Sequence, residues 1–190
     1  MNHGHDDGFG RCDGRRRALL ATGLVLAAGS SLLVPRPAAA HAKPPRRLSF
    51  HHTHTNEQIS VVYHADGRYL TAELEKATRF LRDFRTGDAH PIDPLLFDFL
   101  YAAKVATGSC GVFEVISGYR SPATNAMLRR AGNGVAKRSM HTRGKAIDVR
   151  LTDVDTRVLR DAALKLRHGG VGYYRRSDFV HLDTGRVRSW

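Results

Sequence analysis

Cysteine is scarce in this 190-residue sequence, which contains only Cys12 and Cys110. Cys12 falls within the first 40 residues, a segment interpreted below as a removable leader. The mature chain would then hold one cysteine and could form no intramolecular disulfide, so its fold must depend on a hydrophobic core. The remaining length is sufficient, since a domain of ~150 residues buries roughly 70% of its unfolded surface. With 42% hydrophobic and 25% charged residues, the composition is that of a globular protein.

Long apolar runs are also scarce, and the only one spans residues 18–34. It follows Arg15, Arg16 and Arg17, and a small-residue cleavage site comes after it, either Ala38-Ala39-Ala40 or Ala40-His41-Ala42. This order is that of a secretory signal peptide. The Arg16-Arg17 pair followed by apolar residues resembles the twin-arginine export pattern. An uncleaved anchor is the alternative, because a run of this length is near the lower limit for a membrane span.

These features predict the organisation of the chain. We expect residues 1–40 to be a signal peptide of the twin-arginine type, residues 41–47 a linker, and residues 48–190 one folded domain. The mature chain lacks a long apolar run, so we expect no stable membrane insertion. The protein is expected to be exported to the periplasm or cell envelope.

Acidic residues are outnumbered, with 18 Asp and Glu against 30 Lys and Arg and a formal net charge of +12. Residues 1–40 hold five Arg and three Asp, which contribute +2 and leave +10 for the mature chain. A basic domain favours an anionic partner: nucleic acid, acidic lipid or a carboxylate-rich polymer. Because the leader directs the protein out of the cytoplasm, we expect no nucleic-acid partner.

The hydrophobic pattern mixes strands and helices without a regular alternation. Strands are predicted at residues 48–54, 58–64, 112–116, 146–151, 171–174 and 179–183. Helices are predicted from Thr71 as a cap to Gly87, from Asp93-Pro94 to Lys104, from Ser121 to Arg130, and from Asp155 to Arg167. This pattern favours the α+β class, with a single domain around a central, largely antiparallel sheet flanked by helices.

The residues that could carry chemistry lie in the last third of the chain. His141 lies seven residues before Asp148, which falls within a predicted strand, and His181 lies on another strand. Two histidines and one carboxylate are the ligand set of a catalytic zinc site, which keeps a fourth position open. Asp178 lies three residues before His181 and could act as general base. Taken singly, each of these residues also has an ordinary structural interpretation.

Two other clusters compete for a metal. His52 and His54 would share one face of a strand, where they could bind a metal. The plainer interpretation is an exposed strand that tolerates histidine. Asp153 and Asp155 flank Val154 and could bind a cation, although a helix cap explains them as well.

Several motifs together resemble a known family, the LAS-type zinc peptidases of metallopeptidase family fifteen. These comprise D-alanyl-D-alanine carboxypeptidases, dipeptidases and murein endopeptidases, and the resemblance is strongest to the exported murein endopeptidase branch. It covers about residues 48–190. It rests on Ser-x-His-x-x-Gly-x-Ala-x-Asp at 139–148, Asp-x-x-His-x-Asp at 178–183, Gly-Tyr-Arg-Ser-Pro at 118–122 and the segment 181–190.

The resemblance implies a Hedgehog/D-Ala-D-Ala peptidase-like fold and one zinc ion per chain, bound by His141, Asp148 and His181. It places Asp178 at the position of the catalytic base, where related dipeptidases have Glu. It also implies that Arg120 faces the substrate and that Ser139 contacts it. A fixed guanidinium near the metal suits a developing oxyanion or a substrate carboxylate.

The expected function is a zinc-dependent murein endopeptidase that hydrolyses peptide cross-links of peptidoglycan with metal-activated water. Its partners would be peptidoglycan stem peptides and cross-links, which fits the basic mature chain. One alternative is a zinc D-Ala-D-Ala carboxypeptidase that trims stem peptides. The other is a non-enzymatic peptidoglycan-binding module, against which the presence of every ligand and the base argues.

Overall fold

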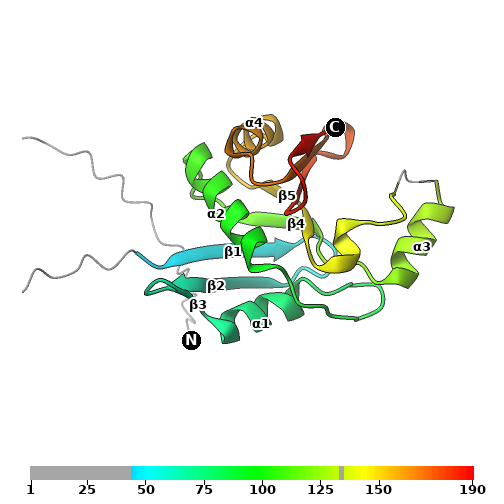
Figure 1. The fold of residues 1–190 in the computed structure, drawn as a ribbon, viewed down its shortest axis with the longest axis horizontal. Helices are drawn as coiled ribbons and strands as arrows, with labels where there is room; N and C mark the ends of the chain where they lie inside the picture. The colour runs from blue at the N-terminus through cyan, green and yellow to red at the C-terminus, as the bar shows by residue number, and fades with distance from the viewer. Residues whose placement is uncertain (1–43, 133–134) are drawn as a thin grey trace, which may run out of the picture. The chain divides into compact units, whose positions relative to one another are not determined.

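The computed structural model describes residues 44–132 and 135–190, and the predicted leader lies outside this part of the chain. The described residues form one sheet of eight strands in the order β3-β2-β1-β4-β5-β7-β6-β8 (Figure 1). The strands are β1 (Arg46–His52), β2 (Gln58–Ala65), β3 (Arg68–Tyr69), β4 (Phe113–Ser117), β5 (Ala146–Leu151), β6 (Gly170–Tyr174), β7 (Phe179–Asp183) and β8 (Arg188–Ser189). Two strand pairs, β1 with β4 and β6 with β8, are parallel, and the other five are antiparallel. The predicted α+β class with a largely antiparallel sheet is confirmed.

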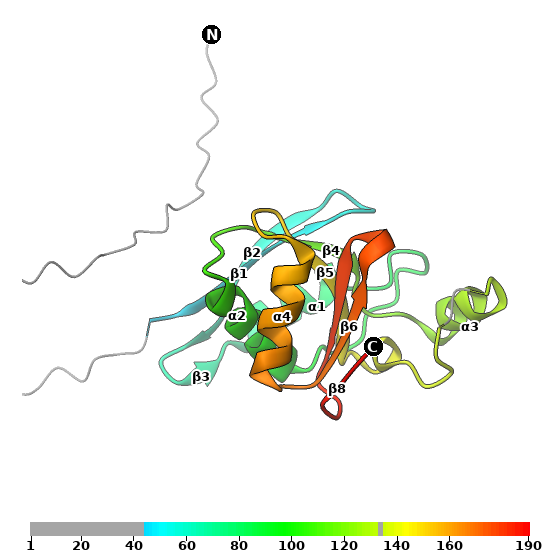
Figure 2. The ribbon, with the colours of Figure 1, turned by 90° about the horizontal axis from the view of Figure 1, so that it is seen from above.

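Three helices pack on one face of the sheet. The helices of the described residues are α1 (Thr71–Phe80), α2 (Pro94–Thr107), α3 (Pro122–Arg130) and α4 (Thr156–Leu166), with short 3-10 helices η1 (Met140–Arg143) and η2 (Arg175–Ser177). The ring of Phe50 on β1 lies 6.1 Å from that of Phe80 on α1 and 6.4 Å from that of Phe97 on α2. Leu159 of α4 belongs to the same buried cluster. By contrast, α3 protrudes at one end of the molecule (Figures 1 and 2).

The alternation of side chains along the strands separates the core from the opposite face of the sheet. Ile147 and Val149 on β5 are fully buried in the hydrophobic cluster. Asp148 lies between them and therefore points to the other face. His181 on β7 is the register partner of Asp148, so the two side chains share that face. The strand pairing thus places a carboxylate and an imidazole side by side.

Three of the four helix starts follow the predicted capping pattern. The side chains of Asp93, Ser121 and Asp155 accept hydrogen bonds from backbone N–H groups in the first turns of α2, α3 and α4. Proline follows the cap directly in α2 and α3, where no amide donor is needed.

The prediction for the first helix was wrong at both ends. Leu70 is the cap residue, without a side-chain hydrogen bond, so Thr71 is the first helical residue. The helix ends at Phe80 because the Leu81 carbonyl accepts a hydrogen bond from Tyr119 N at 2.8 Å. The amide of Arg85, which a continued helix would direct at Leu81, donates to Asp83 Oδ1 at 3.0 Å. A tertiary contact therefore ends a helix whose apolar spacing continues.

Other differences are small. The strand β1 begins at Arg46, two residues earlier than expected, because Arg46 and Arg47 pair with β2. The two-residue strands β3 and β8 were not predicted, since segments this short carry no periodic signal.

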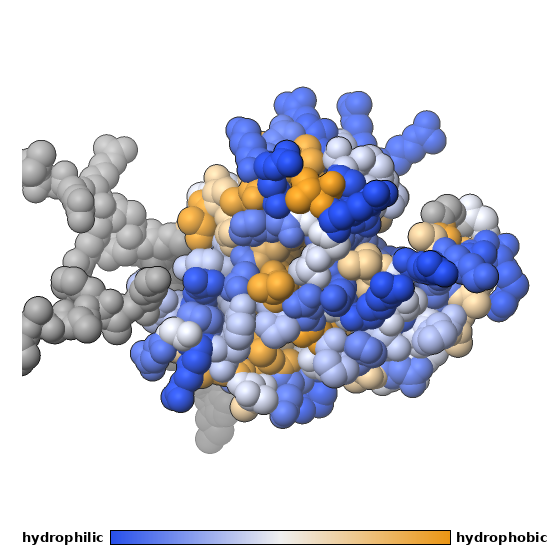
Figure 3. Space-filling view, in the orientation of Figure 1, coloured by the Kyte–Doolittle hydropathy of each residue, from blue (hydrophilic) through white to orange (hydrophobic). Residues whose placement is uncertain are grey.

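Polar side chains cover most of the face seen in Figure 3, and its hydrophobic residues form separate patches. Within residues 44–132 and 135–190, no helix combines the length and apolar character needed to cross a membrane.

Candidate metal centre

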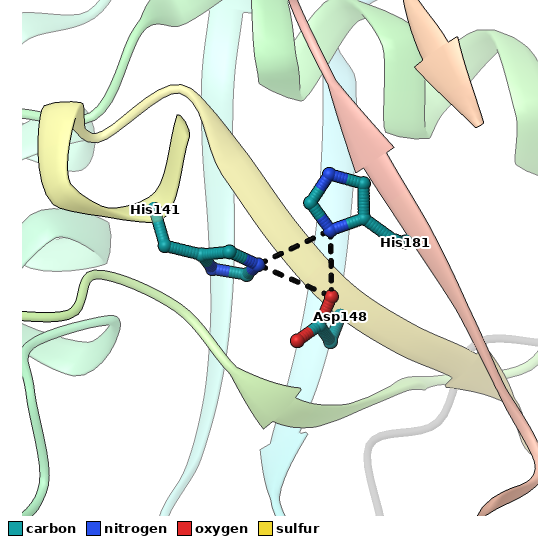
Figure 4. Close-up of side chains that lie close together, drawn as sticks. All are labelled: His141, Asp148 and His181. Carbon is teal, nitrogen blue, oxygen red and sulfur yellow. Dashed lines mark hydrogen bonds and ion pairs between the residues drawn. The ribbon is translucent and has the colours of Figure 1, made fainter. Parts of the chain in front are cut away.

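The structure brings the three predicted ligands together. His141 lies on η1, Asp148 on β5 and His181 on β7, and their side chains point toward one another (Figure 4). His141 Nε2 lies 3.2 Å from Asp148 Oδ1 and 3.2 Å from His181 Nδ1. His181 Nδ1 lies 2.8 Å from Asp148 Oδ1. In the part of the chain that the structure describes, no other group of three or more His, Cys, Asp or Glu side chains converges in this way.

Two glycines allow the backbone to bring His141 to the strands. Gly144 ends η1 with a φ of 62°, and a Cβ at this position would clash with the Pro91 carbonyl oxygen. Gly118 packs against the backbone of Leu81, where a Cβ would also clash. Its carbonyl oxygen accepts a hydrogen bond from His141 Nδ1 at 2.7 Å. Steric contacts therefore require glycine at both positions, and the carbonyl of Gly118 also orients the ligand His141.

The hydrogen-bond partners fix the tautomers of both histidines. A carbonyl oxygen only accepts, so His141 carries its proton on Nδ1 and turns an unprotonated Nε2 toward the group. Asp183 Oδ2 lies 3.0 Å from His181 Nε2, so this imidazole turns an unprotonated Nδ1 inward. When both imidazoles are neutral, three lone-pair donors therefore face one point. This arrangement fits a cation, because without one the lone pairs would repel each other.

The electrostatics of the group favour ligation. Burial lowers the pKa of His141, with a further contribution from the charge of Arg120, which keeps this imidazole neutral. Burial raises the pKa of Asp148, but the interactions with His141 and His181 outweigh burial and hold that pKa far below its usual range. Burial lowers the pKa of His181, whereas its hydrogen bonds to Asp148 and Asp183 raise it, and the net shift is upward. A metal would displace a proton from His181, so metal binding competes with acid.

Arg120 reaches the group, as the resemblance implies. Its Nη2 donates to Asp148 Oδ2, the oxygen that does not face the histidines, and its Nε donates to Ser117 Oγ at 2.8 Å. The side chain is 14% exposed, so the guanidinium lies at the boundary between the buried ligands and solvent. Ser139 is buried, and its Oγ accepts a hydrogen bond from His141 N at 3.3 Å. A substrate contact of either residue stays a prediction.

Asp178 lies outside the group of three. Its Oδ1 accepts a hydrogen bond from Thr156 Oγ1 at 2.8 Å, and its Oδ2 lies 3.6 Å from Arg150 Nη1. The side chain is 62% exposed. Arg150 is two residues after Asp148 on β5 and leaves the strand on the same face. The carboxylate is therefore held beside the metal-binding face, and its role as base stays a prediction.

The sequence interpretation missed Asp183, the carboxylate behind His181. Asp183 is fully buried, and besides His181 it accepts hydrogen bonds from Arg188 and from Gly185 N. Burial raises its pKa, but the hydrogen bonds from His181 and Arg188 lower it to about 2. Asp183 lies two positions after His181 on β7, with only Leu182 between them, and this spacing could have indicated that the two side chains share a face.

The competing clusters form no metal site. His52 is buried against the rings of Phe80 and Phe84, and its Nδ1 accepts a hydrogen bond from His54 N. The structure places His54 beyond the end of β1, so the expected shared strand face was wrong. Asp155 caps α4, as the plainer interpretation held. The carboxylate of Asp153 accepts hydrogen bonds from the loop at residues 109–111.

The ligands open into a cleft with a volume of about 700 Å³. Besides the ligands, Arg120 and Ser139, its lining includes an aromatic group formed by Tyr174, Phe179 and Trp190. The rings of Tyr174 and Phe179 stack at 4.5 Å, and Trp190 Nε1 donates to Tyr174 Oη at 3.0 Å. The ring of Trp190 lies 5.2 Å from that of His181. A cleft of this size suits a ligand of several residues.

An α+β sheet that presents two imidazoles and a carboxylate to an open cleft defines a metallopeptidase-type site. Residues 40–190 match the Peptidase_M15_2 family, described as peptidoglycan L,D-endopeptidase MepK, and the chain belongs to this family. The predicted family resemblance is confirmed.

Individual relatives agree with this assignment. "Peptidoglycan L,D-endopeptidase MepK" of Escherichia coli (strain K12) is 44% identical over 179 residues, which cover 94% of this chain and 98% of the relative. "Probable peptidoglycan L,D-endopeptidase MepK" of Haemophilus influenzae is 42% identical over 180 residues, covering 94% and 96%. Among solved structures, the Serratia marcescens L-Ala D-Glu endopeptidase ChiX is 25% identical and covers 40% of this chain and 62% of its own, with a TM-score of 0.33.

Proposed function

We propose that this chain is a zinc-dependent murein endopeptidase that hydrolyses peptide cross-links of peptidoglycan. The observation that carries the proposal is the convergence of His141, Asp148 and His181 at the cleft, in a chain that belongs to a peptidoglycan endopeptidase family. The names of the relatives further suggest that the bond cut is an L,D bond.

Zinc is the metal that the donor set suits best. Two neutral imidazole nitrogens and one carboxylate oxygen match a three-ligand catalytic zinc site with an open position toward the cleft. When bound, the ion supplies a Lewis acid that acidifies water and polarises the scissile carbonyl. The chain's own contribution is to hold the ligands: Gly118 and Asp183 fix the imidazoles, and Arg120 fixes the free oxygen of Asp148.

The proposed roles of the remaining residues follow from their places. Arg120 offers a fixed positive charge to the oxyanion that forms as the peptide carbonyl is attacked. Asp178 takes the proton from the attacking water and passes it to the leaving amine. For this step its carboxylate must turn from Thr156 and Arg150 toward the ligands. Ser139 is proposed to contact the substrate from the cleft wall.

Export and localisation are part of the proposal. Residues 1–40 have the order of a twin-arginine signal peptide, and residues 41–45 would link it to the zinc peptidase domain, which begins with β1 at Arg46. A peptidoglycan substrate requires the periplasm or cell envelope. The +10 charge of the mature chain supports attraction to a polymer rich in carboxylates.

Digestion of purified sacculi tests this function. The mature protein is incubated with sacculi with and without a chelator, and the released muropeptides are separated by chromatography. We expect loss of cross-linked dimers only in the absence of chelator. Release of free D-Ala with intact dimers would favour a carboxypeptidase, and binding to sacculi without any product would favour a wall-binding module.

A further inference from the structure

The cleft holds more positive charge than its own carboxylates balance. Its lining includes four arginines, whereas Asp148 is the only acidic residue of the lining. Two of the arginines are paired, since Arg120 contacts Asp148 and Arg188 contacts Asp183. Arg85 and Arg138 make no ion pair with any residue of 44–132 or 135–190. Two guanidinium charges in the cleft are thus left for a ligand.

Arg85 lies over an aromatic ring, and its side-chain N–H groups donate no hydrogen bond to the described part of the chain. Its guanidinium carbon lies 4.2 Å from the centre of the Phe84 ring. The same ring stacks on His54 at 4.3 Å with an interplanar angle of 15°, and His54 also lines the cleft. A guanidinium that stacks through its face still presents its N–H groups in the plane, where they match the two oxygens of a carboxylate.

The backbone around Arg85 is tied to the segment that carries Arg120. The amide of Arg85 donates to Asp83 Oδ1 at 3.0 Å, and Asp83 Oδ2 accepts from Ser121 N at 2.8 Å. Asp83 is 1% exposed, so this link is shielded from water. Ser121 directly follows Arg120 in the chain. The stacked cation is therefore fixed relative to the metal-binding group.

Arg138 approaches the cleft from the segment that carries a metal ligand. It directly precedes Ser139, whose Oγ accepts from His141 N at 3.3 Å at the start of η1. Arg138 itself is exposed. Its backbone position is thus set by the same turn that positions His141, while its side chain is available to a ligand.

We infer that Arg85 and Arg138 form a carboxylate-binding subsite of the cleft, which recognises a free carboxylate of the stem peptide next to the bond that is cut. This rests on the proposed function, which supplies the peptide. Arg120 is proposed to face the oxyanion at the scissile bond, which leaves the free carboxylate to Arg85 and Arg138. The subsite therefore separates substrate recognition from the group that does the chemistry.

Two matched substrates test the inference: a cross-linked muropeptide dimer with free carboxylates, and the same dimer with those carboxylates amidated. The rates of the wild type are compared with those of Arg85→Ala, Arg138→Ala and the double variant. Arg157→Ala, an exposed arginine on α4 outside the cleft lining, is the control for loss of charge alone. Zinc content and thermal unfolding are measured for every variant.

The wild type should prefer the free-carboxylate dimer by ~10–100-fold in kcat/KM, the scale of hydrogen bonds to a charged group. Each single variant should lose part of this preference through a higher KM, and the double variant should lose most of it. Arg157→Ala should behave as the wild type. Arg85→Lys should recover only part of the preference that Arg85→Ala loses, because an ammonium lacks the planar donor pair of a guanidinium.

Equal cleavage of both dimers by the wild type would overturn the subsite and leave the endopeptidase function intact. Should the wild type cleave neither dimer, the proposed function fails, and calorimetric binding of the same two dimers decides the subsite. Tighter binding of the free-carboxylate dimer that disappears in the double variant would support it. Equal binding of the two would refute it.

Discussion

Asp183 acts on the metal centre through His181, because its carboxylate accepts a hydrogen bond from His181 Nε2 at 3.0 Å. Because this bond fixes which ring nitrogen carries the proton, Asp183→Asn should weaken zinc affinity by ~10–100-fold, the usual effect of such partners. The measurement is a competition titration with a chromophoric chelator. Asp161→Asn, at an exposed carboxylate on α4, is the control and should keep the wild-type affinity. Unchanged affinity in Asp183→Asn would show that the tautomer is set by something else.

A second residue-scale prediction separates chemistry from metal binding. Asp178→Ala should retain one zinc per chain, because Asp178 contacts none of the three ligands in the structure. Its rate of dimer cleavage should fall by ~10²–10⁴-fold, the scale of a positioned acid–base group. The two readouts are metal analysis and initial rates on the same sample. A variant that keeps the wild-type rate would remove Asp178 from the mechanism, and one that loses its zinc would make it part of the metal centre.

At the same scale, sequence reasoning identified the three converging residues because two short motifs carry them, one at residues 139–148 and the other at residues 178–183. It did not show how they are held. The partner of His141 is a backbone carbonyl, that of Gly118, which no side-chain motif reveals. Asp178 is close to His181 in sequence, yet its carboxylate contacts Thr156 and Arg150, and only the folded chain shows these partners.

At the scale of elements, the turn after η1 decides where His141 lies. Gly144 has a φ of 62°, and a side chain there would meet the Pro91 carbonyl oxygen. Gly144→Ala should therefore lower the free energy of unfolding by more than ~2 kcal/mol and also reduce zinc affinity, since backbone strain adds to a steric clash. The control is Gly67→Ala, with a φ of 76° but no heavy atom within 4 Å, which should cost only ~1–2 kcal/mol. Denaturant unfolding measures the free energy of unfolding of both variants. An equal loss in Gly144→Ala and Gly67→Ala would contradict the steric account.

The elements also show where periodicity predicts well and where it does not. The strands that carry Asp148 and His181 were predicted within one residue of their observed ends, because β-branched and apolar residues alternate there with the functional side chains. The end of α1 could not be predicted, since the apolar spacing continues to Phe84. What ends the helix is the hydrogen bond between Tyr119 N and the Leu81 carbonyl, residues 38 positions apart in the sequence.

For the whole molecule, His52 makes stability depend on pH. Its side chain is buried, and Nε2 has no hydrogen-bond partner within the described residues. Burial, with a smaller contribution from the charge of His54, lowers its pKa from 6.5 to about 4. The unfolded chain therefore holds more protons than the folded chain between these two values, so stability should fall as the pH drops from about 6.5 to about 4.

The loss from this one group is at most about 3 kcal/mol. Urea unfolding of the metal-free protein at several pH values measures it, and His52→Leu should remove this part of the pH dependence. Because the variant also changes packing, the slope against pH is compared and not the absolute stability. Parallel curves for the wild type and His52→Leu would show that His52 does not titrate on unfolding.

The central claim for the molecule is that one metal centre, built by η1, β5 and β7, carries the peptidase activity. The most direct measurement is the zinc content of the purified mature protein and of His141→Ala, Asp148→Ala and His181→Ala, with dimer cleavage assayed on the same samples. The wild type should hold about one zinc per chain, since one complete ligand set lies among the described residues. Each variant should lose most of its zinc and its cleavage together. Full zinc content in all three variants would contradict the account.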